Sequence, residues 1–454
     1  MDPTEISKIA KWAGGRLVRG GGGAQVTTIC TDSRALNAGD LFLALRGTNF
    51  DGHTFVNEAA RLGAAGAVVD TVPDGLPENF AVIEVAETLA ALQQIAAYYR
   101  RSLPMKSVVI TGSNGKTSTK DFTAAVLAGH CQVVKTEGNL NNHIGLPLTI
   151  LRASVEDQVG VFEIGMNHPG EIEPLARIAR PDVGIITNIG VAHIEFMGTR
   201  DAIALEKGML AEAVPEDGAV VLDADDEYTQ AISQRSKART VTCGVRGGDI
   251  VASNIRYTIE GNQFHVNAFG DEFDARIGPP GEHMVRNALF AIAAGTIFGL
   301  TSEQCVAGLA QANLTSGRVE QKNIRGIQVI DDSYNANPDS MIAALRTLAL
   351  MPAHGQRIAV LGRMGELGPE TLRGHARVGE AAGELKIDCV VGVGEEASWT
   401  SKSAREHGVQ HTFQVPSTRQ AAGLLRVLAH PGDVVLVKGS RSAHMEKILE
   451  GFAA

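Results

Sequence analysis

The segment Thr111–Ser118 (TGSNGKTS) carries the residue types that bind a nucleotide phosphate. It follows the apolar run Ser107–Ile110 and precedes a helical pattern, so it joins a predicted strand to a predicted helix. A glycine-rich turn at such a junction lets backbone N–H groups and a helix N-terminus face phosphate oxygens. Lys116 would add a positive charge for the outer phosphates, and Thr117 a hydroxyl ligand for Mg²⁺. The segment predicts nucleotide binding.

This loop is shorter than the general pattern G-x4-G-K-[ST]. Ile110 stands where the first glycine is expected, and only Gly112 precedes Gly115. A Gly-Lys-Ser/Thr fragment alone also arises by chance, but the flanking strand and helix favour a phosphate-binding loop. The residues that the loop would bring to the phosphates are Gly112, Ser113, Asn114, Gly115, Lys116, Thr117 and Ser118.

Two further polar residues follow apolar runs. Glu163 closes the run VGVFEIG and could supply the carboxylate oxygen that a phosphate-bound metal needs, although a solvated strand end is the alternative. His193 follows the run Val183–Asn188 in the corresponding position, and a lone histidine is more often structural than a ligand. Neither residue defines a site by itself.

The elements that must position these residues have an alternating strand and helix pattern. The segments SVVITGSNGKTSTKDFTAAVL, VGVFEIGMNHPGEI, VGIITNIGVAHIEF and AVVLDADDE each place an apolar run before a Gly- or Asn-rich turn or an acidic turn. Parallel strands flanked by helices require this pattern. Sites in such sheets lie beyond the carboxyl ends of the strands. The sequence therefore predicts an α/β fold with Lys116, Glu163 and His193 at the functional edge.

Length and pattern predict three domains. At roughly 150 residues per domain, 454 residues give about three. Residues 1–84 are predicted to form a small α/β unit, and residues 85–314 contain the four strand-and-turn segments given above. In residues 315–454 the alternation of strands and helices begins again, which predicts a separate doubly wound domain.

The first domain is predicted to contain short elements. The segment PDGLPEN predicts a turn that ends it, and the apolar spacing over Val85–Tyr99 predicts an amphipathic helix into the next domain. A further helix is expected between the last two of its strands. The other expected elements are a helix at Pro3–Trp12 and strands at Val26–Thr31, Leu41–Ala44 and Ala67–Val69.

Composition excludes several classes of protein. The 44% apolar and 20% charged residues exclude a largely disordered chain. A net charge of -10 argues against a non-specific nucleic-acid binder, which needs clustered positive charge. An anionic ligand must therefore be held locally.

The sequence also indicates a compartment. The five cysteines contain no CxxC pair, which argues against a disulfide framework or a zinc site. The first residues, MDPTEISKIAKWAGG, lack an apolar signal core. The most apolar stretch, Ala288–Leu300, is too short to span a bilayer and predicts a buried helix. We expect a cytoplasmic protein without membrane insertion.

Several segments in order resemble the ATP-dependent Mur ligases of bacterial cell-wall synthesis. They are TGSNGKTS, TEGNLNNHIGLPLT, FEIGMNHPGEI, TNIGVAHIEFMGT and DDSYNANPDSM. YNANPDS resembles the members that add D-alanyl-D-alanine to UDP-N-acetylmuramoyl-tripeptide. The resemblance covers nearly the whole chain. It implies an N-terminal domain for the UDP-sugar, a central P-loop ATPase domain, and a C-terminal Rossmann-like domain that closes over ATP and carries the dipeptide.

In the N-terminal block, TDSRALNAGDLFLALRGTNFDGHTF is similar to the family's uridine-nucleotide segment, which implies UDP contacts for Ser33 and Arg34. Chemistry alone would leave Arg34 an ordinary surface residue. The resemblance also implies that Asn139, Asn141 and Asn142 lie on a loop near the substrate and the metal, although Asn-rich stretches are commonly turns.

In the central block, the resemblance assigns Lys116 and Thr117 to the phosphates and a first Mg²⁺, and Glu163 and His193 to metal binding. Lys207 matches the lysine that these ligases carbamylate to hold a second Mg²⁺. From the local sequence alone, Lys207 would be expected to be a solvent-exposed, charged side chain.

The adenine segment is a partial match. GEHMVRNALFA resembles the family's adenine-binding motif, and Asn287 matches its base-reading residue. Met284 replaces an Asn that is common there.

At the junction with the C-terminal domain, the resemblance implies a phosphate contact for Arg318 and a ribose contact for Asp332. A closing motion is expected near Thr315–Arg318. The loop residues that would face the join between domains are Tyr334, Asn335 and Asn337.

The segment LGRMGELG departs from the family's LGDMxELG, because Arg363 occupies the acidic position. The effect of that change on ATP or dipeptide contacts is left open. His375 and Lys438–Arg441 match positions near the cleft, without a role that the residues themselves indicate.

The family mechanism transfers the γ-phosphoryl group of ATP to the tripeptide carboxylate, and the dipeptide amine then attacks the acyl phosphate. Lys116 and two Mg²⁺ ions would stabilise the negative charge on the transferred phosphoryl group. The alternatives are another amide ligase of the superfamily, of the third-residue-adding or folylpolyglutamate type, and a non-ligase P-loop protein. We expect a monomer, and the third residue of the tripeptide stays open.

Overall fold

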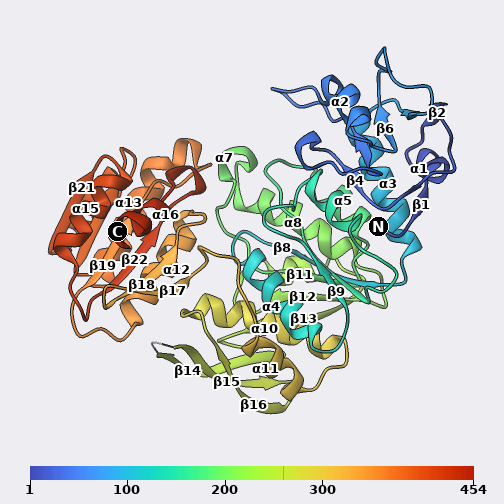
Figure 1. The fold of residues 1–454 in the computed structure, drawn as a ribbon. Helices are drawn as coiled ribbons and strands as arrows, with labels where there is room; N and C mark the ends of the chain where they lie inside the picture. The colour runs from blue at the N-terminus through green and yellow to red at the C-terminus, as the bar shows by residue number, and fades with distance from the viewer. Residues whose placement is uncertain (259, 454) are drawn as a thin grey trace. The chain divides into compact units, whose positions relative to one another are not determined.

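The computed structural model describes residues 1–258 and 260–453 (Figure 1). By its internal contacts the chain divides into two units. The boundary crosses strand β8 (Lys106–Thr111), so this strand contributes residues to both. The first unit contains Met1–Val109, His130–Gly165 and Glu171–Asp182, and the second contains Ile110–Gly129, Met166–Gly170 and Val183–Ala454.

The first unit begins with a five-stranded sheet of order β2-β7-β6-β5-β4, in which only β2 is antiparallel to its neighbour. Phe42 and Val82 of the strands pack with Val56 and Ala59 of helix α2 to form its core. The elements are β1 (Thr4–Glu5), α1 (Ile6–Trp12), β2 (Arg16–Arg19), β3 (Gln25–Val26), β4 (Ile29–Cys30), η1 (Ser33–Ala35), β5 (Leu41–Leu43), η2 (Gly52–Phe55), α2 (Val56–Arg61), β6 (Gly66–Val69) and β7 (Ala81–Glu84).

Two expected elements of this region have different limits. Helix α1 begins at Ile6 and not at Pro3, because Thr4 pairs with Val26 in the small sheet β1-β3. The single strand expected at Val26–Thr31 is two strands, since Val26 pairs with β1 whereas Ile29 pairs with Leu41 of β5. One run of residues thus serves two sheets.

The rest of the first unit surrounds the strand order β8-β10-β9. Helix α3 (Thr88–Ser102) packs against α5 and α6. It begins three residues later than expected, because the Glu87 side chain accepts hydrogen bonds from the N–H groups of Leu89 and Ala90 and caps the helix there. The other elements are β9 (Val133–Lys135), α5 (Gly145–Ile150), β10 (Val159–Glu163) and α6 (Ile172–Ala179).

The second unit contains the strand order β16-β15-β14-β13-β12-β11-β8. Strands β11 to β14 are parallel, whereas β14, β15 and β16 form an antiparallel meander (Figure 1). The elements are α4 (Lys116–Ala128), β11 (Val183–Ile186), α7 (Ile194–Met197), α8 (Arg200–Ala213), β12 (Ala219–Asp223), α9 (Thr229–Ser233), β13 (Arg239–Gly244), β14 (Ile250–Thr258), β15 (Gly261–Ala268), β16 (Asp271–Ile277), α10 (Glu282–Ile297) and α11 (Ser302–Ala310).

Helix α10 is the buried helix that the apolar stretch predicted. Its residues from Ala288 to Gly295 are all buried, and it packs against α4 and against strands β12 to β14. The helix that follows the phosphate loop is thereby fixed to the core of the sheet.

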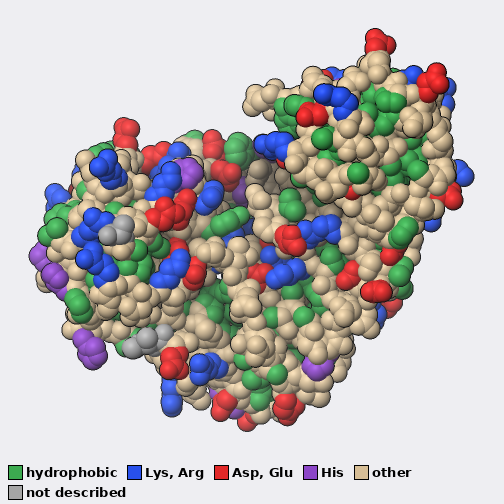
Figure 2. Space-filling view, in the orientation of Figure 1, with side chains coloured by type: hydrophobic (Ala, Val, Ile, Leu, Met, Phe, Trp, Pro, Cys, Tyr) green, Lys and Arg blue, Asp and Glu red, His purple; other side chains and the backbone are tan. Residues whose placement is uncertain are grey.

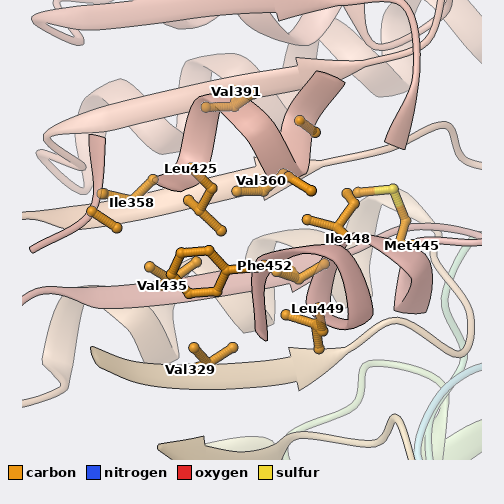
Figure 3. Close-up of a cluster of buried hydrophobic side chains, with 14 of the residues drawn as sticks. Val329, Ile358, Val360, Val391, Leu425, Val435, Met445, Ile448, Leu449 and Phe452 are labelled. Carbon is orange, nitrogen blue, oxygen red and sulfur yellow. The ribbon is translucent and has the colours of Figure 1, made fainter. Parts of the chain in front are cut away.

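The same unit ends in a six-stranded sheet of order β17-β18-β22-β19-β20-β21, parallel except for β17. Helices α15 and α16 cover one face, where Val360, Val435, Leu425 and Phe452 share a core (Figure 3). Helix α12 contacts β19 and β22, helix α14 contacts β20 and β21, and α13 packs against α12 and α14. The elements are β17 (Glu320–Ile324), β18 (Ile327–Asp332), α12 (Pro338–Leu350), β19 (Arg357–Leu361), η3 (Gly368–Glu370), α13 (Thr371–Glu384), β20 (Cys389–Val393), α14 (Ser398–Glu406), β21 (His411–Val415), α15 (Thr418–Leu428), β22 (Val434–Lys438), η4 (Arg441–Ala443) and α16 (Glu446–Ala453).

The predicted α/β fold with mostly parallel strands is confirmed. Among the described residues, no helix has both the length and the apolar character needed to cross a membrane. On the face drawn in Figure 2, Lys and Arg side chains are interspersed with Asp and Glu side chains.

Candidate active site

The predicted phosphate loop lies between β8 and α4, as its sequence requires. Gly115 adopts φ +83° as the N-cap of α4 and has no side chain to occupy the helix end. The first N–H groups of a helix have no partner within the helix, so they are available to an anion. Lys116 Nζ donates to the Gly112 carbonyl at 2.7 Å, which holds the ammonium group over the loop.

The residues that follow β11 hold this loop in place. Ser113 N–H donates to the Asn188 carbonyl (2.9 Å), and Asn114 N–H donates to Asn188 Oδ1 (3.0 Å). Thr187 Oγ1 donates to the Asn114 carbonyl at 2.5 Å. A Cβ on Gly112 would lie 1.9 Å from Thr187 Oγ1, so only glycine fits. Thr187 and Asn188 were not predicted as site residues, although their position at the end of a predicted strand was a usable signal.

The predicted base-reading residue lies beside the loop. A Cβ on Gly115 would lie 2.4 Å from Asn287 Oδ1, which is too close for any side chain. The glycine therefore allows Asn287 of α10 to lie directly against the loop. Met284 is buried and its Sδ accepts a 3.6 Å contact from Asn287 Nδ2. The methionine therefore supports Asn287 in this chain.

Lys207 is a fully buried amine. It lies on α8 with 0% of its surface exposed, and Nζ has no hydrogen-bond partner. Burial, together with the charge of Lys116, lowers the pKa of Lys207 well below its usual value. The default expectation of a solvated charge is thus wrong, because packing of α8 removes the side chain from water. Burial therefore disfavours the charged form of this amine.

His193 faces an acidic side chain of the C-terminal sheet region. Its Nδ1 lies 2.5 Å from Glu366 Oε2, an ion-pair distance without the alignment of a hydrogen bond. Burial lowers the pKa of His193, and the Glu366 carboxylate opposes that shift. His193 beside it holds the pKa of Glu366 below its usual range. Glu366 was not predicted as a site residue.

Glu163 ends β10 in the first unit and is 2% exposed. Its Oε1 accepts a 2.8 Å hydrogen bond from Asn141 Nδ2, while Oε2 has no hydrogen-bond partner. An unpartnered buried carboxylate oxygen is costly unless a ligand or cation completes it. The solvated strand end is therefore excluded for this residue.

The three asparagines of the preceding loop differ from one another. Asn141 contacts Glu163, whereas Asn142 Oδ1 accepts from the N–H groups of Ile144 and Gly145 and forms a turn. Asn139 is exposed. Only Asn141 is brought to a predicted metal ligand.

A loop of the C-terminal region touches the phosphate loop. Asn337 Nδ2 donates to Asn114 Oδ1 at 2.8 Å, and Asp339 Oδ2 accepts from the Val191 N–H at 3.0 Å. Tyr334 N–H donates to the Gly317 carbonyl, and the side chain of Asn335 accepts from its neighbour's N–H. Among these predicted residues, Asn337 makes the direct contact.

The two predicted nucleotide contacts at the junction are both held by neighbours. Lys438 Nζ lies 2.5 Å from Asp332 Oδ2, which gives Lys438 a partner that the sequence did not indicate. The Arg318 guanidinium lies 4.2 Å from the ring centroid of Tyr334, and its Nε has no hydrogen-bond partner. At the expected hinge, Thr315 donates through N–H and Oγ1 to Asp121 Oδ2 of α4 (2.9 and 2.8 Å).

Arg363, the departure from the family pattern, forms an ion pair with Glu396 at 3.2 Å. Next to it, His375 is fully buried, accepts from the Met364 N–H through Nε2 at 3.3 Å, and contacts Thr400 through Nδ1 at 3.0 Å. His375 therefore fixes the loop that carries Glu366. Arg363 is accommodated by a carboxylate on the adjoining segment.

The predicted uridine contacts lie on the surface of the first unit. Arg34 is 88% exposed in its side chain and pairs with Asp32 at 2.7 Å. Ser33 is half-buried in the same short helix. The guanidinium keeps the pKa of Asp32 at about 2.

Within the described residues, no group of three His, Cys, Asp or Glu side chains is placed to hold a metal. The second unit does bring together the phosphate loop with Asn287, Asn337 and Thr187, and Lys207 lies where the charge of Lys116 acts on it. Such an arrangement can bind a nucleoside triphosphate and place its outer phosphates beside the Lys116 ammonium group and the buried Lys207 amine.

Comparison with known proteins supports one family. Residues 25–100, 110–295 and 317–441 match the models described as "Mur ligase family, catalytic domain", "Mur ligase middle domain" and "Mur ligase, glutamate ligase domain". The chain is 37% identical to the UDP-N-acetylmuramoyl-tripeptide--D-alanyl-D-alanine ligase of Bacillus subtilis, over 93% of this chain and 92% of the relative.

Solved structures of similar proteins support the same family. MurF from Acinetobacter baumannii has a TM-score of 0.91 at 32% identity, covering 100% of this chain and 99% of that one. The MurF ligase from Thermotoga maritima in complex with ADP has a TM-score of 0.85 at 29% identity, covering 94% and 97%. By sequence and by fold, this chain belongs to the Mur ligase family.

Proposed function

We propose that this chain is an ATP-dependent ligase that joins D-alanyl-D-alanine to UDP-N-acetylmuramoyl-tripeptide. The observation that carries the proposal is the hydrogen bond between Asn337 and Asn114. It places YNANPDS, the segment that distinguishes the D-alanyl-D-alanine-adding members, on the phosphate loop. Two relatives that the chain covers over 92% and 94% of their length carry this activity in their names.

The reaction must activate a carboxylate, because forming a peptide bond from a free carboxylate is uphill in water. Transfer of the γ-phosphoryl group of ATP to the tripeptide carboxylate gives an acyl phosphate and ADP. The dipeptide amine attacks its carbonyl, and phosphate leaves. Lys116 and the N-terminus of α4 stabilise the charge on the transferred group. Asn287 positions the base, Asp332 the ribose and Arg318 a phosphate.

The residues fit the magnesium that the family uses. Thr117 offers a buried hydroxyl, and Glu163 offers an unpartnered buried oxygen. Lys207 offers a buried amine with a lowered pKa, whose uncharged form CO₂ can convert to a carbamate. We assign these residues and His193 as the metal-binding set. Bound Mg²⁺ would supply charge neutralisation and a template for the phosphates.

The remaining assignments extend the same proposal. Residues 1–84 bind the UDP-sugar through Ser33 and Arg34, residues 85–314 bind ATP, and residues 315–454 carry the dipeptide. Asn139, Asn141, Asn142, Tyr334 and Asn335 contact substrate. We propose a cytoplasmic monomer whose C-terminal domain turns near Thr315–Arg318 and excludes water from the acyl phosphate.

Phosphate release tests the proposal. The full chain is mixed with ATP, Mg²⁺, UDP-N-acetylmuramoyl-tripeptide and D-alanyl-D-alanine, and each component is omitted in turn. Phosphate should appear only with all four. Release without the dipeptide, or with glutamate or diaminopimelate in its place, would overturn the assignment and favour another ligase of the family.

A further inference from the structure

The acidic turn after strand β12 takes no part in the assignments above. We define it as Asp223–Asp226, the residues DADD of the segment AVVLDADDE. Strand β12 runs parallel to β11, and Ile186 pairs with Leu222 near the ends of the two strands. Both strands therefore end at the same edge of the sheet. Because ligand sites of such sheets lie beyond these carboxyl ends, the acidic turn is in a position to serve the nucleotide site.

The backbone of the acidic turn is fixed from within. Asp223 Oδ1 accepts a hydrogen bond from the Asp225 N–H at 2.9 Å, and the Asp223 carbonyl accepts from the Asp226 N–H at 3.2 Å. The side chains of Asp223 and Asp225 are only 7% and 4% exposed. The carboxyl groups of the turn are therefore held in set directions by one short, hydrogen-bonded piece of backbone.

One side of the acidic turn holds helix α10 through Arg286. The guanidinium lies 3.2 Å from Asp223 Oδ2 through one amino group and 3.2 Å from Asp225 Oδ2 through the other. The second amino group also donates to Glu282 Oε1 at 2.9 Å, within α10. A planar guanidinium between two buried carboxylates has one allowed direction. A rotation of α10 that moved the neighbouring Asn287 from the phosphate loop would break these contacts.

The other side of the acidic turn holds the segment after β11. Asp226 Oδ2 accepts from the Ile189 N–H at 2.7 Å, and its Oδ1 accepts from the Tyr228 N–H at 2.9 Å. The residue before Ile189 is Asn188, whose side chain accepts from the Asn114 N–H and donates to the Asn114 carbonyl, both at 3.0 Å. One peptide unit thus separates the Asp226 contact from a residue bonded to the phosphate loop.

The ion pairs of Arg286 are partly offset by desolvation. Burial raises the pKa of Asp223 to about 6, and the charge of Arg286 opposes that shift. Since desolvation cancels much of the attraction in a buried ion pair, a gain in stability does not by itself account for this cluster. What the contacts do fix is the direction of α10 at its first turns.

We propose that the acidic turn sets the position of the two halves of the nucleotide site relative to one another, with Arg286 and Asp226 as its positioning residues. Arg286 holds Asn287 at the base, and Asp226 holds Asn188 and through it the phosphate loop. The inference rests on the proposed function, because it takes ATP as the nucleotide. Each residue acts through its neighbour, so each controls a different part of one ligand.

Calorimetric titration without the other substrates tests the two roles separately. ATP is compared in the presence of Mg²⁺ with inosine triphosphate, which lacks the 6-amino group that an asparagine amide can read, and with inorganic tripolyphosphate. The variants are Arg286→Met and Asp226→Asn. The matched controls are Arg276→Met, on the exposed surface of β16, and Asp217→Asn, exposed two residues before β12.

The two variants should give opposite results. Arg286→Met should lower the preference for ATP over inosine triphosphate about 3- to 10-fold, with the affinity for tripolyphosphate near wild type. Asp226→Asn should lower the affinity for tripolyphosphate about 3- to 10-fold and keep the preference for ATP. The asparagine has a single acceptor oxygen and cannot keep both N–H hydrogen bonds. Both controls should match wild type.

The proposal is overturned if Arg286→Met keeps the wild-type preference, or if either variant changes both measures together, as a general loss of structure would. Arg286→Lys covers the case in which Arg286→Met fails to fold because two buried carboxylates lose their cation. Its single ammonium group keeps the charge but not the two-armed contact, so part of the preference should be lost, and a full wild-type preference would overturn the role of Arg286.

The same titrations separate this inference from the proposed function. A wild-type chain that does not bind ATP would refute the proposed function itself. Variants that match a wild-type chain that binds ATP would refute only the positioning role.

Discussion

The side chain of Asn337 both caps helix α12 and contacts the phosphate loop. Its Oδ1 accepts from the Ser340 N–H at 2.9 Å and caps α12, while its Nδ2 donates to Asn114 Oδ1 of the phosphate loop at 2.8 Å. The cap therefore orients the amide toward the loop. This relationship couples the start of a C-terminal helix to the nucleotide site.

Two substitutions separate these roles. Asn337→Ser keeps a good N-cap but is too short to reach Asn114, whereas Asn337→Ala loses both. We expect Ala to lower the free energy of unfolding by about 1 kcal/mol and Ser to change it little. Both should lower kcat/KM for ATP by about 3- to 10-fold, the value of one hydrogen bond. Full activity of the Ser variant, with urea unfolding as the stability measure, would show that the contact has no functional role.

Lys116→Ala should abolish turnover, by about 10³-fold or more, because the phosphate loop loses its cation. Its unfolding transition should stay cooperative. Lys106→Ala, at the exposed start of the same strand, is the control and should keep activity. An active, folded Lys116→Ala chain would contradict the phosphate-loop assignment.

Lys207→Ala should be inactive because the carbamate cannot form. Formate or acetate should restore part of the activity, since each supplies a carboxylate to the vacated space. Methylamine is the control, because it would restore only an amine and no carboxylate. Rescue by methylamine and not by acetate would show that the free amine is the functional group.

His375 predicts a pH dependence of stability. Burial, and then the charge of Arg363, lowers the pKa of His375 to about 4, whereas an unfolded histidine titrates near 6.5. Between these values the unfolded state binds a proton that the folded state does not. The free energy of unfolding should therefore fall as pH drops from about 6.5 to 4, by up to about 3 kcal/mol from this residue.

Urea unfolding of His375→Gln at several pH values measures that contribution. Glutamine can still accept from the Met364 N–H but cannot titrate, so the slope over this window should decrease. His354→Gln, at an exposed position, should leave the slope unchanged. Equal slopes for wild type and His375→Gln would contradict the prediction.

The sequence by itself determined the strand and helix alternation, the phosphate loop and the family. These depend on local patterns: an apolar run before TGSNGKTS fixes a strand, a tight turn and a helix N-terminus without reference to the rest of the chain. Ordered segments across the chain then indicated the ligase. The first residues of α1 and α3 were predicted wrongly. Pairing of Thr4 with Val26 and capping by Glu87 make each helix begin later than the apolar pattern indicates.

Only the tertiary structure decided which side chains leave water and which side chains meet. Lys207 has the local sequence of a surface lysine, and its burial depends on how α8 packs. Asn337 meets Asn114 across 223 residues, and Arg286 meets Asp223 across 63 residues. Desolvation and contact over such separations depend on the folded arrangement of the whole unit, and no local pattern of residues encodes them.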